Sequence, residues 1–419
     1  MKMEKRVVIT GTGVISPVGN DTQTFWEALK AGKCGIRPIT ERYPDTELPI
    51  HVAGLVRDFD ATQHGMTVKD TKRNDLYTLY AMAAADEAVR MSGLESGTNI
   101  DPLRYGVYIG SGIGGMETFI EQSRICDNDG ADRVSPLFIP KMISNIAGGN
   151  IAIRYNANGP CLTVVSACAT GTNAIGEAFL AVRSGRCDAI IAGGAEAVLT
   201  PLAIGGFASA KALSLSEDPL HASLPFAGDR GGFVMAEGGA VVVLEEYEHA
   251  KARGAQIIAE VTGYGNTCDA HHATAPRPDG MVAAAAMKQA LEQSGYKAGE
   301  DLYINAHGTG THLNDSTETK AIKIALGEED ARRASISSTK SMTGHMFGAT
   351  GAAELVVSAL ALRDGIIPPT IGLDVPDPEC DLDYTPLKAK ERPVQVAMSN
   401  SLGFGGHNAC VALRKYNGK

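Results

Sequence analysis

Apolar and polar residues alternate along this chain in two kinds of stretch. Short apolar runs are typical of strands, and longer alanine-rich stretches with the spacing of helices separate them. Runs of the first kind occupy residues 7–10, 106–109, 189–192, 240–244 and 257–261. Because strands alternate with helices, the pattern predicts a layered α/β fold.

The pattern also repeats weakly within the chain. The matching pairs are "TGTG" at 10–13 and "TGYG" at 262–265, "AVRMSGL" at 88–94 and "ALEQSGY" at 290–296, "YIGSGIGG" at 108–115 and "YINAHGTG" at 303–310, and "CATGTNAIGEA" at 168–178 and "GATGAAELVVS" at 348–358. Four matches in the same order predict a duplicated strand-helix-strand-helix unit joined near residue 255. We therefore expect two halves, residues 1–255 and 256–419. The alternative is a shared preference for small residues where helices pack closely on a sheet.

Composition and charge narrow the class of protein. The 419 residues are 44% hydrophobic and 21% charged, as in ordinary globular proteins, and no run is apolar enough for a signal peptide or a membrane span. The eight cysteines include no CxxC pair, which argues against a disulfide framework or a zinc site and favours the reducing cytoplasm. The net charge of −10 disfavours nucleic acid and anionic membranes as partners.

The segment "SACATG" places Cys168 where a turn gives way to a predicted helix. A thiol at a helix N-terminus faces free backbone N–H groups and the positive end of the helix dipole, so we expect a lowered pKa and a donor for an oxyanion. Taken alone, a free cysteine can equally be interpreted as a small, buried apolar residue of the core.

Three further residues in polar glycine turns strengthen the catalytic interpretation. His307 lies in "NAHGTGT", and Lys340 and His345 lie in "STKSMTGH". A lone histidine is usually structural, but this set suits acyl transfer from a thioester and stabilisation of the enolate formed when a malonyl group loses carbon dioxide. Each histidine would have to be neutral, and Lys340, balanced by a carboxylate such as Glu318, would help to keep it so.

Competing motifs are incomplete. "GTGVIS" lacks the last glycine of a dinucleotide fingerprint, and no phosphate-binding loop or HExxH sequence is present. Ser111 lacks the glycine two residues before it that a nucleophile elbow needs, and the pair His271 and His272 lacks a third metal ligand at a sensible spacing.

Four motifs together resemble a known family. "VVSACATGTNAIGEAF", "NAHGTGT", "SSTKSMTGH" and "NSLGFGGHN", in this order, are similar to the β-ketoacyl-[acyl-carrier-protein] synthases of the thiolase superfamily, and most closely to their type II branch. The resemblance covers essentially the whole chain. It implies the duplicated thiolase-like αβαβα fold, a cytoplasmic homodimer, and condensation of acyl and malonyl groups in fatty acid biosynthesis. No metal or other cofactor is implied, since phosphopantetheine arrives on the acyl carrier protein.

The resemblance also implies roles for individual residues. Cys168 would accept the acyl chain, and His307 and His345 would bind the malonyl thioester during decarboxylation and condensation. Lys340 would support them electrostatically, paired with Glu318.

Other positions would bind substrate. Phe404, in "GFGG", would form the oxyanion hole with the backbone of Cys168 and would gate the acyl pocket. Thr309 and Thr311 would hold the phosphopantetheine arm, and the remaining substrate-binding positions are Ile113, at the acyl channel, and Phe207. Two residues depart from the family pattern: His312 stands where proline is common, and His407 where threonine is more usual.

An acidic carrier protein needs a basic patch on a chain of net negative charge. Lys69, Lys72 and Arg73 share one face of a predicted helix, and Lys211 resembles a second docking position. The alternative is a solvated face with no role.

Three other functions stay open. The ketosynthase subunit of a type II polyketide system shares these motifs. A non-catalytic chain-length partner usually lacks the cysteine, and a degradative thiolase uses a second cysteine near the C-terminal end, where Cys410 lies several residues beyond "GFGG".

Overall fold

One mixed ten-stranded sheet organises the protein. The computed structural model describes residues 4–418, and its sheet has the strand order β10-β9-β13-β14-β8-β1-β7-β6-β4-β5. The strands are β1 (Val7–Ile15), β4 (Tyr105–Gly110), β5 (Cys161–Leu162), β6 (Ala189–Glu196), β7 (Gly238–Glu246), β8 (Ala259–Cys268), β9 (Leu302–Asn305), β10 (Ser335–Ser337), β13 (Val396–Gly403) and β14 (His407–Lys415). Each of the five predicted strands is present, although β8 begins two residues later than the sequence suggests.

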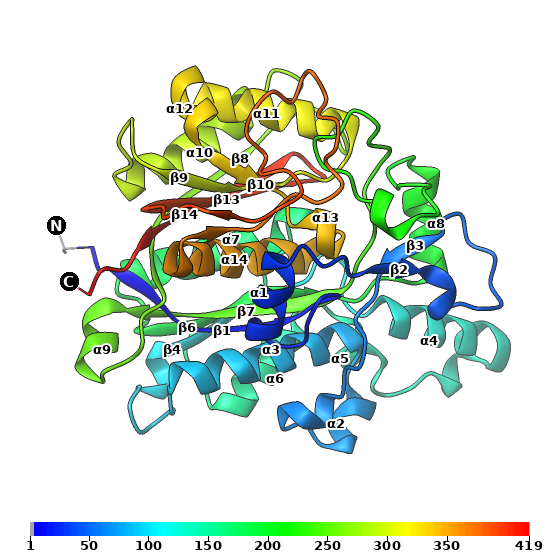
Figure 1. Ribbon diagram of the computed structural model, residues 1–419. Helices are drawn as coiled ribbons and strands as arrows, with labels where there is room; N and C mark the ends of the chain where they lie inside the picture. The colour runs from blue at the N-terminus through cyan, green and yellow to red at the C-terminus, as the bar shows by residue number, and fades with distance from the viewer. Residues whose placement is uncertain (1–3, 419) are drawn as a thin grey trace.

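The sheet folds into two layers with helices between and outside them. Figure 1 shows α7 (Thr170–Arg183) and α14 (Thr350–Asp364) in the middle, with α3 (Leu76–Ser92) and α6 (Ile146–Tyr155) below and α10 (Met281–Ser294) and α11 (His312–Leu326) above. The layers therefore follow the αβαβα order, and the predicted fold is confirmed. The proposed division into residues 1–255 and 256–419 stays a prediction.

Smaller elements join or cover these layers. They are α1 (Thr22–Lys30), α2 (Val68–Arg73), α4 (Met116–Asp129), α5 (Phe138–Met142), α8 (Pro201–Ser209), α9 (Tyr247–Ala252), α12 (Glu328–Arg333), α13 (Lys340–Thr343), β2 (Ile36–Pro38), β3 (Val52–Gly54), β11 (Ile366–Ile367) and β12 (Lys390–Glu391). In the described part of the chain no helix is long and apolar enough to cross a membrane.

Glycines of the repeated motif make equivalent contacts in the two predicted halves. A Cβ atom on Gly11 of β1 would lie 2.0 Å from the carbonyl oxygen of Ala88 in α3, and one on Gly263 of β8 would lie 2.0 Å from that of Ala290 in α10. Each half thus packs a helix against its strand so closely that only glycine fits. This packing is compatible both with a duplicated unit and with a shared preference for small residues, so the duplication stays a prediction.

The helices of the middle layer start in the same way. A 3₁₀ turn, Ala167–Ala169, leads into α7, and a second, Phe347–Ala349, leads into α14. Ala167 and Phe347 both have left-handed backbone conformations, with φ of 51° and 48°. Such strain in non-glycine residues is retained where it positions a functional group, and here it presents Cys168 at the tip of the first turn.

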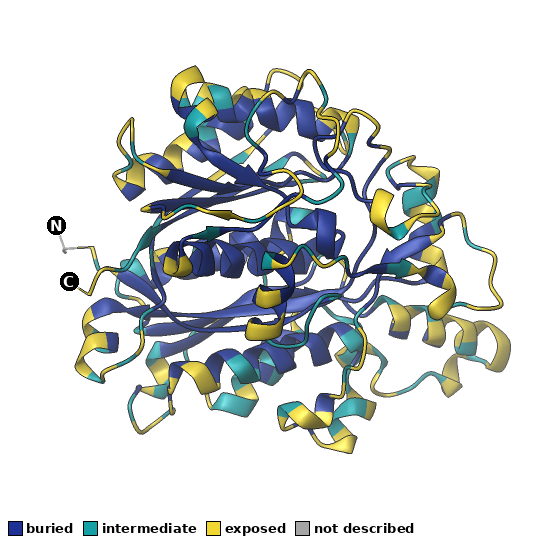
Figure 2. Ribbon diagram, in the orientation of Figure 1, coloured by how far each residue is buried: buried dark blue, intermediate teal, exposed yellow. Residues whose placement is uncertain are grey.

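The middle helices are largely buried, and α14 is buried on all sides over most of its length. Figure 2 shows α7 and α14 almost entirely in dark blue, and every residue of α14 from Thr350 to Leu362 is buried. A helix that is buried on all sides lies inside a core rather than over one, so the N-termini of α7 and α14 are held by packing. This fixed layer carries the candidate site.

Candidate active site

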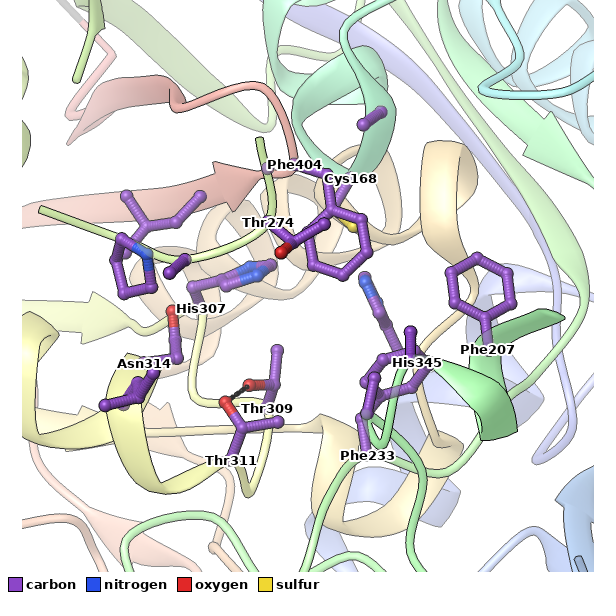
Figure 3. A pocket seen from close by; sticks show the side chains of 18 of the residues that line it. Cys168, Phe207, Phe233, Thr274, His307, Thr309, Thr311, Asn314, His345 and Phe404 are labelled. Carbon is purple, nitrogen blue, oxygen red and sulfur yellow. Dashed lines mark hydrogen bonds between the residues drawn. The ribbon is translucent and has the colours of Figure 1, made fainter. Parts of the chain in front are cut away.

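A cavity of about 440 Å³ opens at the start of the middle helices. Cys168 lies in its wall, together with His307, His345 and Phe404 (Figure 3). His307 comes from the turn after β9, His345 from the turn before α14, and Phe404 from the end of β13. Elements from both predicted halves therefore bring the expected nucleophile and both expected histidines to one place.

Cys168 is a partly exposed residue that lines this cavity. Burial raises its pKa to about 12, while the Lys340 ammonium and the N–H groups of Phe404 and Cys168 act in the opposite direction. The expectation of a lowered pKa is therefore wrong, because loss of solvation outweighs the helix terminus and the nearby charge. The residue rests as a neutral thiol with two backbone donors around its sulfur.

The two histidines lie together and stay neutral. Their ring centroids are 5.5 Å apart, with the ring planes at 85°. Burial, followed by the positive charge of Lys340, lowers the pKa of both His307 and His345 well below the ordinary histidine value. The expectation of neutral imidazoles is confirmed. Nε2 of His345 has no hydrogen-bond partner in the described structure, so it is free to face a substrate.

The partner of Lys340 is not the one that the sequence suggested. Its Nζ lies 2.5 Å from Oε1 of Glu354 in α14, and both side chains are buried. Glu318 in α11 instead accepts the backbone N–H groups of His307 at 2.7 Å and Gly308 at 2.8 Å. Its oxygens are therefore taken up in shaping the histidine turn. The predicted pairing of Lys340 with Glu318 is therefore wrong. Neither residue lines the cavity.

Burial raises the pKa of Glu354 to about 7, and that of Glu318 also to about 7. Lys340 lowers the pKa of both groups, but it forms a hydrogen bond only with Glu354. The sequence analysis did not identify Glu354. The feature that could have pointed to it is an acidic residue one turn into an otherwise apolar helix.

Thr309 and Thr311 form one side of the cavity mouth. Their hydroxyl oxygens are 3.0 Å apart, and Figure 3 shows both below His307. The carboxylate of Asp315 accepts the backbone N–H groups of Thr309 and Gly310. The two hydroxyl groups are therefore held at fixed positions along the path to the histidines.

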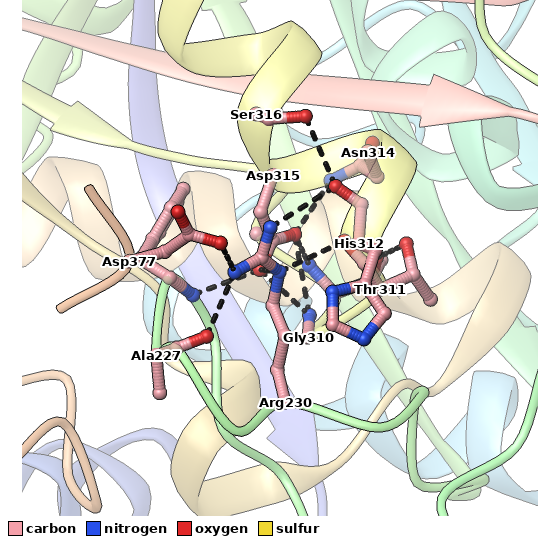
Figure 4. A network of polar contacts seen from close by, with 12 residues as sticks. Ala227, Arg230, Gly310, Thr311, His312, Asn314, Asp315, Ser316 and Asp377 are labelled. Atoms are coloured by element: carbon pink, nitrogen blue, oxygen red, sulfur yellow. Dashed lines mark hydrogen bonds and ion pairs between the residues drawn. The ribbon is translucent and has the colours of Figure 1, made fainter. Parts of the chain in front are cut away.

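The buried side chain of Arg230 contacts the backbone that follows these threonines (Figure 4). The guanidinium of Arg230 is 2.5 Å from Oδ2 of Asp377, and it donates to the carbonyl oxygens of Thr311 at 3.3 Å and His312 at 3.1 Å. Its Nε also lies 3.7 Å from the carboxylate of Asp315. Nothing in the sequence around "GDRGGF" distinguishes Arg230 from a surface arginine, and sequence reasoning missed it.

An apolar compartment lies on the other side of Cys168. Phe207 packs against Phe347 with ring centroids 5.1 Å apart and faces Phe404 at 6.4 Å. Ile113 also lines the cavity, and its N–H donates to Glu196. Phe404 is followed by Gly405, whose φ of 88° suits glycine. The expected acyl-site residues Ile113, Phe207 and Phe404 therefore all line the cavity.

The candidate docking residues fall into two places. Lys69, Lys72 and Arg73 are exposed on α2, at the lower edge of Figure 1, while Lys211 is exposed after α8 and lines the cavity mouth. Their role in docking stays a prediction. Residues 4–418 contain no cluster of three or more His, Cys, Asp or Glu side chains that could hold a metal ion, and the expectation of no cofactor stays a prediction.

The layered fold and its central cavity define a thiolase-like ketosynthase. Two family models match the chain, "Beta-ketoacyl synthase, N-terminal domain" over residues 4–250 and "Beta-ketoacyl synthase, C-terminal domain" over residues 258–374. The chain therefore belongs to the beta-ketoacyl synthase family.

Relatives match over nearly their full length. The 3-oxoacyl-[acyl-carrier-protein] synthase 2 of Synechocystis sp. is 50% identical over 99% of both chains, and that of Staphylococcus aureus is 48% identical over 99% of this chain and 100% of its own. A beta-ketoacyl synthase from Burkholderia phymatum is a similar solved structure, with a TM-score of 0.91 and 34% identity over 99% of this chain and 100% of its own. A type II polyketide ketosynthase in complex with its acyl-carrier protein has a TM-score of 0.89 and 34% identity, over the same shares.

Proposed function

We propose that this chain is an elongating condensing enzyme of fatty acid biosynthesis, a 3-oxoacyl-[acyl-carrier-protein] synthase of type 2. The observation that carries the proposal is the meeting of the Cys168 thiol with two neutral, buried histidines in one cavity. Full-length relatives with this activity in their names support it.

The first half-reaction loads the acyl chain. The sulfur of Cys168 attacks the carbonyl carbon of the acyl thioester, and the N–H groups of Cys168 and Phe404 stabilise the oxyanion. The new sulfur–carbon bond replaces the one to the carrier, and the proton of Cys168 leaves with the phosphopantetheine thiol. Burial raises the pKa of Cys168, so the resting thiol carries the proton that this half-reaction removes.

The second half-reaction uses the two histidines. Malonyl carrier loses carbon dioxide, and the N–H groups of His307 and His345 stabilise the negative charge on the thioester oxygen of the enolate. The enolate carbon attacks the acyl group on Cys168, the sulfur leaves, and it takes up a proton. The products are 3-oxoacyl carrier, carbon dioxide and the free thiol.

The carrier and a second copy of the chain are the proposed partners. Strand β5 is the last strand of the sheet and pairs only with β4, so one edge is open in the described chain. Leu162 in β5, Val165 after it and Ile153 in α6 are exposed, which supports pairing of two copies along this edge. All eight cysteines are free, which supports a reducing, cytoplasmic location.

A ketosynthase subunit of a type II polyketide system is the second candidate, because solved structures of that kind share the fold at 34–35% identity. Such a subunit would need its partner chain to make product. Elongation by the purified protein alone would favour the fatty acid function.

The test combines both questions in one assay. The purified protein is incubated with acyl carrier and malonyl carrier, and 3-oxoacyl carrier and carbon dioxide are measured. We expect product from the wild type and from a Cys126→Ala control, in which an exposed cysteine of α4 is replaced. Product from Cys168→Ala would show that the assigned nucleophile is wrong.

A further inference from the structure

The hydroxyl group of Thr350 contacts one ring nitrogen of His345, Nδ1, while the other has no partner in the described structure. Its Oγ1 lies 3.1 Å from Nδ1 of the imidazole, and each residue is only 2% exposed. Thr350 is the first residue of α14, and this is the one hydrogen bond of its side chain within residues 4–418. Nε2 of the same ring has no partner in that part of the chain.

Two arrangements of the protons are possible. If Nδ1 carried the hydrogen, the hydroxyl proton of Thr350 and the lone pair of Nε2 would both be buried without a partner. If Thr350 donates to Nδ1, the hydrogen is on Nε2, and one unpaired group remains. Because unpaired buried polar groups are costly, the second arrangement is favoured. Its unpaired N–H belongs to a ring that Figure 3 shows reaching into the cavity toward Phe404.

We infer that Thr350 is a positioning residue that fixes His345 as the Nε2–H tautomer, and so keeps its hydrogen-bond donor aimed at the malonyl thioester. The inference rests on the proposed function. It concerns one histidine only, since Nδ1 of His307 has no partner in the described structure.

The two threonines that open the middle helices have different partners. Thr170 opens α7 as Thr350 opens α14, but its hydroxyl accepts the backbone N–H of Ser166 at 2.9 Å. The threonine of the first half thus closes its own turn. The threonine of the second half is directed to a side chain, at the one position where the turn carries a histidine.

The test separates tautomer from packing. Thr350→Val keeps the branched shape and removes the donor, Thr350→Ser restores it, and Ser358→Ala removes another buried hydroxyl of α14 as a control. A neutral hydrogen bond corresponds to about a five- to tenfold change in an equilibrium, so Thr350→Val should slow decarboxylation of malonyl carrier by about that factor. Loading of the acyl chain on Cys168 should be unchanged, and Thr350→Ser and Ser358→Ala should behave as the wild type.

Histidine-selective ¹⁵N NMR gives the direct readout. In the wild type Nε2 of His345 should carry the hydrogen, and in Thr350→Val both tautomers should be present. Equal decarboxylation rates and unchanged spectra in Thr350→Val would overturn the inference and leave the proposed function intact. A wild type that neither loads Cys168 nor decarboxylates malonyl carrier would refute the proposed function instead.

Discussion

The buried pair of Lys340 and Glu354 gives the sharpest test of the arrangement behind the histidines. Replacing Lys340 by Met removes the charge and keeps much of the volume, and replacing Glu354 by Gln removes the opposite charge. Each single change leaves one buried ionisable group without its partner. The double variant leaves neither.

The size of the effect follows from burial and distance. The side chains are 1% and 2% exposed, with 2.5 Å between the charged atoms, so solvent cannot replace a lost partner. Breaking such a pair from one side costs about 3–5 kcal/mol of unfolding free energy. The double variant should lose no more unfolding free energy than one single variant does. The two single losses together therefore exceed the loss of the double variant by a coupling energy of about 3 kcal/mol.

Chemical denaturation of the wild type, the two single variants and the double variant measures this coupling. The four proteins are compared at equal concentration, and the slope of the unfolding free energy against denaturant concentration is compared among them. The matched control is the same cycle between Lys340→Met and Glu318→Gln. Because Glu318 bonds to backbone N–H groups and not to Lys340, its coupling should be much smaller. Equal coupling in both cycles, or larger coupling to Glu318, would refute the assignment of Glu354 as the partner.

Three further predictions concern other parts of the structure. Because the pKa of Cys168 is raised to about 12, its alkylation by iodoacetamide should accelerate from about pH 7 to about pH 10 without levelling off, and a plateau near neutrality would contradict the account. Gly265→Ala would place a Cβ atom 1.8 Å from a carbonyl oxygen of α10 and should lower the melting temperature, whereas Gly149→Ala, with no atom within 4 Å, should not. Glu245 raises the pKa of His249, so the stabilisation is complete below the unfolded pKa and is lost as pH rises through the folded value; His249→Asn should therefore cost more unfolding free energy at low pH than at high pH, and a constant difference would exclude this linkage.

The sequence was informative where chemistry and local geometry coincide. A cysteine before a helix, and histidines in glycine-containing turns after strands, indicate positions that the strand ends of an α/β fold bring together. Cys168, His307 and His345 were predicted on this basis, and the structure places them in one cavity. The glycine echo between β1 and β8 was visible because close packing of a helix restricts the residue type in both halves.

Other features depend on contacts between distant segments. Both Glu318 and Glu354 lie on helices near the site, and only the orientation of those helices decides which one faces Lys340. The pKa of Cys168 depends on how much protein surrounds the thiol, which no local pattern records. Arg230 acts through carbonyl oxygens of a loop that is distant in sequence, so its neighbours in the chain carry no signal.

Intact-protein mass spectrometry after incubation with acyl carriers of several lengths tests the central claim most directly. We expect a single acyl group per chain, located by peptide mapping on Cys168, absent from Cys168→Ala and retained in Cys126→Ala. An acyl group on another residue, or undiminished loading of Cys168→Ala, would contradict it.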